Sequence, residues 1–208
     1  MSAALKTPLM VLLTLVFSIS LLAQETPEIE VTNVRFDRIA NDWIVATVQI
    51  TAERNPLPTA RDVDYMDDVR LTMNVCYEVA NVPDGEVPFD FYRSSVRMVS
   101  LEQSVRYSVY FFLPGVVRDR DDLDVDPFAW LIEMEVGGTP VAMETDQAGG
   151  EIKVDAEGYE NFLSRANSMA PENDGIFLPM YLAPDFIVDS ARIRSSEVPS
   201  FYRFELEN

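Results

Sequence analysis

The chain has 208 residues, 48 % of them hydrophobic, which is enough to build the core of one domain and argues against disorder. Its 35 acidic and 16 basic side chains give a formal net charge of −19, so we expect no nucleic-acid partner. Histidine is absent, which excludes Ser-His-Asp and Cys-His catalysis and histidine-ligated zinc. With Cys76 as the single cysteine, no intramolecular disulfide can form, and the core alone must hold the fold.

Residues 1–23 have the organisation of a secretory signal peptide. Lys6 supplies one positive charge, an uncharged apolar run follows at 9–23, and polar residues come directly after it. The run is shorter than the ~20 residues that cross a bilayer. We therefore expect an exported protein, cleaved after Ala23, in the periplasm, the outer membrane or at the cell surface. Because Leu21 is a poor residue for a signal peptidase, the alternative is an uncleaved membrane anchor, and no other membrane contact is expected.

Alternation of apolar and polar residues recurs along the rest of the chain and predicts half-buried strands. Gly137 and Gly138 stand between two such runs and predict a hairpin turn, since both turn positions need a positive φ. In chain order, the pattern predicts strands at 28–35, 44–50, 70–80, 91–101, 106–113, 128–136, 139–145 and 201–207.

The only good helix candidate is 156–169, where apolar residues keep helical spacing and Asp155 can cap the N-terminus. Many short strands separated by Pro and Gly turns favour an all-β fold. We expect an immunoglobulin-like β-sandwich of about 7–9 strands with one appended helix near 156–169. The expected organisation is a signal peptide at 1–23, the sandwich at 24–145, and a helix plus C-terminal strand or cover segment at 146–208, packed on the same domain.

The apolar segments at 176–182 and 186–188 are interrupted by prolines and are expected to cover the sandwich. The alternative is an edge that exchanges a strand with a partner. Leu101, Tyr107 and Val109 resemble the tyrosine-corner pattern, in which a strand tyrosine bonds back to the preceding backbone. An ordinary alternating strand explains the same residues.

An aspartate-rich loop at 118–126 is the candidate metal site. Asp122, Asp124 and Asp126 occupy positions 1, 3 and 5 of a calcium-loop register, with Glu133 at position 12. Pro127 stands where an EF-hand needs glycine, no helix is expected before the loop, and Glu133 falls in a predicted strand, so we expect no EF-hand. A looser calcium site at Asp122, Asp124 and Asp126 remains, with a solvated acidic turn as the alternative. Calcium is the one cofactor that the sequence leaves open.

Three further features admit a functional and a structural interpretation. The acidic cluster at 62–68 is either a surface loop or a source of paired carboxylates for glycoside hydrolysis. Trp43 opens its strand and is either packed or exposed as a sugar-stacking platform. Cys76 is either a small core residue under a second layer or the site of an intermolecular disulfide.

The opening strand EIEVTNV at 28–34 and the hairpin WLIEMEVGGTPV at 130–141 follow an export signal in an acidic, strand-rich chain. This layout, over about residues 24–145, is similar to that of a small secreted immunoglobulin-like protein family encoded with type IV pilus machinery in Gram-negative bacteria. The resemblance implies an extracytoplasmic, pilus-associated or adhesion role with no catalytic residues.

We therefore expect a non-enzymatic extracytoplasmic interaction module, linked to a type IV pilus or another envelope or surface assembly. Its partner would be an envelope or surface-appendage protein. The alternative is a carbohydrate- or calcium-binding β-sandwich module, and an enzyme that uses carboxylates is the third hypothesis.

Overall fold

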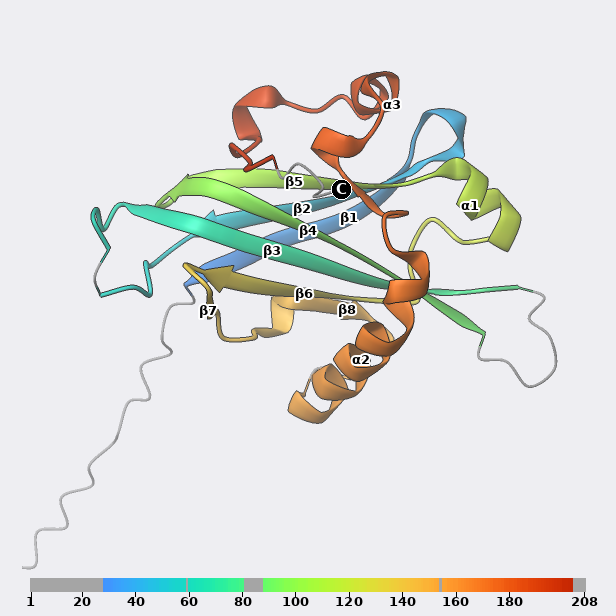
Figure 1. Cartoon of the computed structure of the whole chain (residues 1–208), viewed down its shortest axis with the longest axis horizontal. Helices are drawn as coiled ribbons and strands as arrows, with labels where there is room; N and C mark the ends of the chain where they lie inside the picture. The colour runs from blue at the N-terminus through green and yellow to red at the C-terminus, as the bar shows by residue number, and fades with distance from the viewer. Residues whose placement is uncertain (1–27, 59, 81–87, 154, 204–208) are drawn as a thin grey trace, which may run out of the picture.

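The computed structural model describes residues 28–203 except 59, 81–87 and 154 (Figure 1). The signal peptide predicted at 1–23 lies outside the described residues. Within the described ranges, no helix is both long and apolar enough to cross a membrane. The chain forms two antiparallel sheets that pack face to face in a sandwich-like arrangement, so the expected mainly β sandwich is confirmed at this level.

The first sheet has four strands in the order β1-β2-β5-β9. The second has five, in the order β4-β3-β6-β7, with the short β8 also paired to β6. The four-stranded sheet consists of β1 (Ile29–Arg38), β2 (Ile44–Ala52), β5 (Arg106–Leu113) and β9 (Leu178–Pro179). The five-stranded sheet consists of β3 (Tyr65–Glu78), β4 (Phe89–Glu102), β6 (Ala129–Val136), β7 (Thr139–Pro140) and β8 (Ala148–Gly150).

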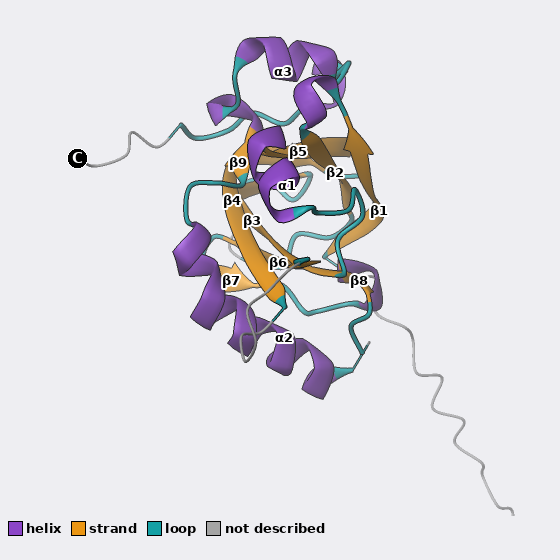
Figure 2. Ribbon diagram, turned by 90° about the vertical axis from the view of Figure 1, so that its right-hand side faces the viewer, coloured by secondary structure: helices purple, strands orange, loops and turns teal. Residues whose placement is uncertain are grey.

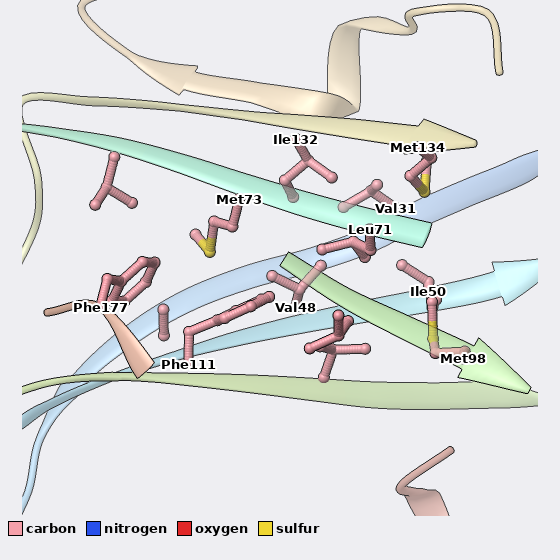
Figure 3. Packing of buried hydrophobic residues seen from close by; sticks show 14 of the residues in the cluster. Val31, Val48, Ile50, Leu71, Met73, Met98, Phe111, Ile132, Met134 and Phe177 are labelled. Carbon is pink, nitrogen blue, oxygen red and sulfur yellow. The ribbon is translucent and has the colours of Figure 1, made fainter. Parts of the chain in front are cut away.

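Apolar side chains from the inner faces of both sheets meet in one core (Figure 3). Leu71 and Met73 of β3 are fully buried there, as are Val48 of β2 and Phe111 of β5. Phe177 closes one end of this core and stacks on Phe111 with ring centroids 5.4 Å apart. The predicted alternation thus places every second residue of these strands between the sheets.

The outer face of each sheet is also covered, from opposite sides of the sandwich (Figure 2). The α2 helix lies on the five-stranded sheet, while α3 and its flanking segments lie on the four-stranded sheet. Strand β2 is therefore buried along almost its whole length on both faces. The helices are α1 (Gly115–Asp121), α2 (Ala156–Met169) and α3 (Asp185–Ser190), with 3₁₀ turns η1 (Ala40–Asp42), η2 (Thr145–Gln147), η3 (Ala170–Asn173), η4 (Met180–Leu182) and η5 (Ser195–Glu197).

Several local predictions are confirmed in detail. The predicted helix has the observed bounds of α2, and Asp155 Oδ1 accepts a hydrogen bond from the Gly158 N–H at 2.7 Å. Gly137 and Gly138 have φ values of +55° and +79° and form the turn between β6 and β7. Where the chain passes from β4 in one sheet to β5 in the other, the Tyr107 hydroxyl accepts from the Glu102 N–H at 3.1 Å. Tyr107 thus bonds back to the preceding backbone, but a tyrosine corner belongs to the corner between strands E and F of an immunoglobulin fold, so this bond alone does not identify that topology.

Other predictions need correction. The strand expected at 139–145 ends at Pro140, and of the strand expected at 201–207 only an isolated bridge between Phe201 and Met98 is seen, while 204–208 lie outside the described residues. The structure has more helical elements than the single one expected, because α1 and α3 are too short to show a helical period in sequence. The expectation that no helix precedes the aspartate-rich loop is wrong, since α1 leads directly into it.

Candidate functional site

Strand β1 forms the free edge of the four-stranded sheet. It pairs with β2 on one side, with a bulge between Val31 and Asn33. On its other side, the hydrogen bonds of the described residues give it one partner: the Val31 N–H donates to Asp146 Oδ2 at 3.0 Å. The Asn33 and Arg35 side chains are exposed along this strand. An open strand edge of this kind offers unpaired backbone donors and acceptors to another chain.

A groove of about 280 Å³ runs beside the β1 edge, between it and the β6–β8 side of the other sheet. Val34 and Phe36 of β1 line one wall, while Pro127 and Trp130 line the other. Both β1 side chains are half-buried. In a strand added to β1, alternate side chains would point toward this groove, because strand residues alternate between faces.

The long edge on the opposite side of the sandwich, β4, is covered in part by other segments of the chain. The Val99 N–H donates to the Ser200 carbonyl, and the Tyr202 N–H donates to the Arg97 carbonyl, each at 2.8 Å. Farther along, the Asn173 side-chain amide donates to the Phe91 carbonyl at 3.1 Å. The terminal segment at 200–202 therefore acts as a short extra strand on β4, and we call it the terminal strap.

The aspartate-rich loop lies between α1 and β6. Asp122 follows α1 in a left-handed conformation, with φ +52°, and Asp122, Asp124 and Asp126 are all exposed. In the ranges that the structure describes, no three Asp, Glu or Cys side chains come together as metal ligands. Asp126 instead lines the groove beside β1. The calcium site at these three residues stays a prediction from the sequence.

One carboxylate of the 62–68 cluster, that of Asp68, is engaged in an ion pair. Asp68 forms a two-pronged ion pair with Arg97, whose Nη2 lies 2.7 Å from Asp68 Oδ2. This hydrogen bond is the largest influence on the pKa of Asp68, which lies below its ordinary value. Asp62, Asp64 and Asp67 are exposed. The cluster therefore contributes one structural ion pair and a solvated loop.

A different acidic group, not singled out in the sequence, has the perturbed environment expected of an acid–base site. Burial raises the pKa of Asp90, and the negative charge of Asp121 raises it further. The Tyr92 hydroxyl donates to Asp90 Oδ2 at 3.4 Å, and Asp121 is itself paired with Arg120. Asp90 is not among the residues that line the groove beside β1, so this perturbed carboxyl and that groove are separate features.

Trp43 and Cys76 both belong to the packing under the outer covers. Trp43 is half-buried and packs against the cluster that includes Phe112 and Ile187. Cys76 is 4 % exposed beneath α2, where burial raises its thiol pKa to about 12. The expectation of a small core residue under a second layer is confirmed.

A cavity with an apolar lining lies between α2 and the outer face of the five-stranded sheet and has a volume of about 420 Å³; we call it the α2 cavity. Its base is Cys76 and Ala129, its walls are phenylalanines, and Lys153 and Arg165 stand at its rim. Sequence reasoning missed this site because its residues come from five separate segments. The one available signal was that Lys153 is the only lysine after residue 6.

Comparisons with known proteins bear on the fold only. Neither the family models nor the curated proteins compared with the sequence match it. Among solved structures, the chain is similar to a protein from Akkermansia muciniphila known from its crystal structure, with a TM-score of 0.57 and 13 % sequence identity. The similarity covers 85 % of this chain and 93 % of that chain. At this identity the likeness supports the sandwich architecture without carrying a function across.

Proposed function

We propose that this protein is a non-enzymatic extracytoplasmic interaction module, which binds an extended segment of an envelope or surface-appendage protein along the β1 edge. The observation that carries the proposal is the asymmetry of the two long sheet edges. The chain closes β4 with its own terminal strap, whereas β1 has one side-chain partner among the described residues. Backbone pairing on such an edge supplies affinity, and side-chain pockets beside it supply specificity.

The groove beside β1 supports this mode of binding. It lies where every second side chain of an added strand would point, and its walls include the aromatic rings of Phe36 and Trp130. The charges of Arg35, Asp37 and Arg38 on β1 discourage pairing with an arbitrary strand, as charged edge residues do in other sheets. A partner would therefore need a complementary pattern of charges as well as an apolar side chain for the groove.

We infer further that the sandwich is of the immunoglobulin-like type. In this assignment β1, β2 and β5 correspond to strands A, B and E of one sheet, and β4, β3, β6 and β7 correspond to C′, C, F and G of the other. The order of neighbouring strands supports this assignment. The exception is β9, which occupies the place of strand D although it comes near the end of the chain.

The absence of histidine supports a non-enzymatic role, as does the involvement of Asp68 and Asp121 in ion pairs with arginines. Export is supported by the signal-like segment at 1–23. The type IV pilus stays among the assemblies to be tested, because the resemblance in strand layout implies it.

The experiment is affinity capture from native envelope with two proline variants, Asn33→Pro and Val34→Pro. Backbone N–H groups alternate in direction along a strand, so one variant loses an outward donor and the other loses a rung to β2. The variant whose thermal unfolding stays close to wild type identifies the outward position. We expect wild type to capture a defined set of envelope proteins and this folded variant to lose it.

Capture of the same proteins by the folded proline variant would refute binding along the β1 edge. Repeating the capture with calcium and with a chelator tests the loop at Asp122, Asp124 and Asp126 in the same series. Loss of the captured proteins on chelation would make that loop part of the site.

A further inference from the structure

The α2 cavity has the lining of a small-molecule site. Two pairs of phenylalanine rings form its walls, with centroid separations of 4.8 Å for Phe89 and Phe128 and 5.4 Å for Phe91 and Phe162. Its volume of about 420 Å³ falls within the range of known ligand pockets and suits one aromatic ring with a short side chain. Aromatic walls favour a flat apolar ligand, because offset and edge-to-face ring contacts add to area burial.

Two cations stand at the rim of this cavity because of the way α2 is built. Gly158, Phe162 and Arg165 lie on one face of the helix, at intervals of four and three residues. A side chain at Gly158 would place a Cβ 2.2 Å from the Lys153 carbonyl oxygen, so only glycine lets the preceding segment lie this close to the first turn. The close approach brings Lys153 to the same rim as Arg165.

Neither rim cation has an acidic partner among the described residues, although the chain carries 35 acidic side chains. Most arginines of the described part are paired: eight take part in ion pairs, and Arg93 is bonded to two asparagines. Glu151 also lines the cavity, and Asp90 is close enough to influence Cys76, so the site is not uniformly positive. Two unpaired cations above an aromatic-walled cavity are suited to a ligand that brings its own negative charge.

We propose that the α2 cavity binds a small aromatic monocarboxylate, with the ring between the phenylalanines and the carboxylate between Lys153 and Arg165. This site lies on the far side of the five-stranded sheet from the groove beside β1 and is independent of the interaction proposed there. Binding needs no reaction with Cys76, whose buried thiol is neutral at physiological pH because its pKa is about 12.

The test uses three probes of the same shape and different charge: 3-phenylpropanoate, its neutral amide, and the cationic 3-phenylpropylamine. Calorimetric titration of the purified protein should give the tightest binding for the acid, about tenfold tighter than the amide, which is the effect of ~1.4 kcal/mol from charged hydrogen bonds. The amine should bind most weakly. Equal affinity for acid and amide, or no binding of either, would overturn the proposal.

Variants that remove one charge show whether that side chain favours or disfavours binding of the acid. Lys153→Met and Arg165→Met should each reduce the preference for the acid over the amide, and the double variant should abolish it. Glu151→Gln should strengthen acid binding, since it removes a like charge from the rim. These side chains are exposed, so the variants should keep the wild-type thermal unfolding. Arg61→Met, in an exposed loop outside the cavity lining, is the matched control and should change nothing.

Nuclear magnetic resonance locates the ligand. Titration of 3-phenylpropanoate into wild type should shift the assigned amide resonances of residues that line the cavity, such as Ala129 and Phe162. The same titration should shift them much less in the Lys153→Met, Arg165→Met double variant. Shifts confined to residues outside the cavity, despite acid binding by calorimetry, would place the ligand elsewhere and refute the site.

Discussion

The two outer covers of the sandwich are built in different ways. Over the four-stranded sheet, the C-terminal segment makes an apolar contact: Phe112 is fully buried, and Ala183 and Ile187 close over it. A cavity of about 420 Å³ lies within this cover, lined by residues such as Met180, Val188 and Val198. Over the five-stranded sheet, α2 contacts polar as well as apolar side chains of the sheet. Asn74 is fully buried there and accepts from Arg93 at 2.6 Å while donating to Glu133 at 2.9 Å. The α2 cavity lies beside this network.

The difference shows how one sandwich can use its two outer faces for separate purposes. A cover whose contact with the sheet is apolar contributes stability through apolar burial. A cover that also keeps a buried polar network contributes less, and α2 leaves the charged side chains of Lys153 and Arg165 beside its cavity. We therefore assign stability mainly to the C-terminal cover, and the ligand binding proposed above to the α2 cover.

The largest expected effect comes from removing a buried ring beneath the C-terminal cover. Phe112→Ala should lower the free energy of unfolding by about 3–5 kcal/mol, because the side chain is 0 % exposed and its loss leaves a cavity. Phe162→Ala under α2 should cost at most about 3 kcal/mol, since the ring is 7 % exposed and already borders empty space. Urea unfolding measures both, and an equal or reversed order would contradict the comparison.

The polar network under α2 comes next. Asn74→Ala should cost about 1–3 kcal/mol, because it leaves the Arg93 guanidinium and the Glu133 carboxylate without a shared buried partner. A double-mutant cycle with Arg93→Ala should show a coupling energy above about 0.5 kcal/mol. Additive losses in the cycle would mean that Asn74 and Arg93 do not stabilise each other.

The attachment of α2 depends on its first turn. Asp155→Ala should lower stability by about 1 kcal/mol, because the Gly158 N–H loses its side-chain acceptor. Amide exchange should accelerate in the first turn of α2 and stay unchanged in α3. Faster exchange in both covers would show that they unfold together.

The smallest effect concerns the terminal strap. Asp68 holds Arg97, and the Arg97 guanidinium lies 4.9 Å from the centre of the Tyr202 ring. Asp68→Asn should cost about 0.5–1 kcal/mol at neutral pH, the range of a partly exposed ion pair. The Asp68 pKa is lowered in the folded protein from its ordinary value of 3.8, so this stability is present above that pH and lost as the pH falls through the lowered pKa. Denaturant unfolding of wild type and Asp68→Asn should show a smaller difference in unfolding free energy at pH 3 than at pH 7. A difference that does not change with pH would contradict this prediction.

The structural features that the sequence predicted correctly are those that depend on interactions between residues close together in the chain. The capped helix at 156–169 and the Gly137–Gly138 turn follow from short-range backbone chemistry, and they are observed as expected. The strict alternation of buried and exposed residues failed where a third layer covers a sheet, as along β2, because a covered strand is apolar on both faces. The α2 cavity could not be predicted, since it exists only where β3, β4, β6 and α2 meet with the segment at 151–153.

The asymmetry of the sheet edges also limits how copies of this chain can join. A strand can be added at β1, while β4 already carries the terminal strap. If β1 is the docking edge proposed above, two copies that pair β1 to β1 would each use this edge in a two-fold contact. Such a contact closes on itself, so it would join two copies and would not by itself extend a filament.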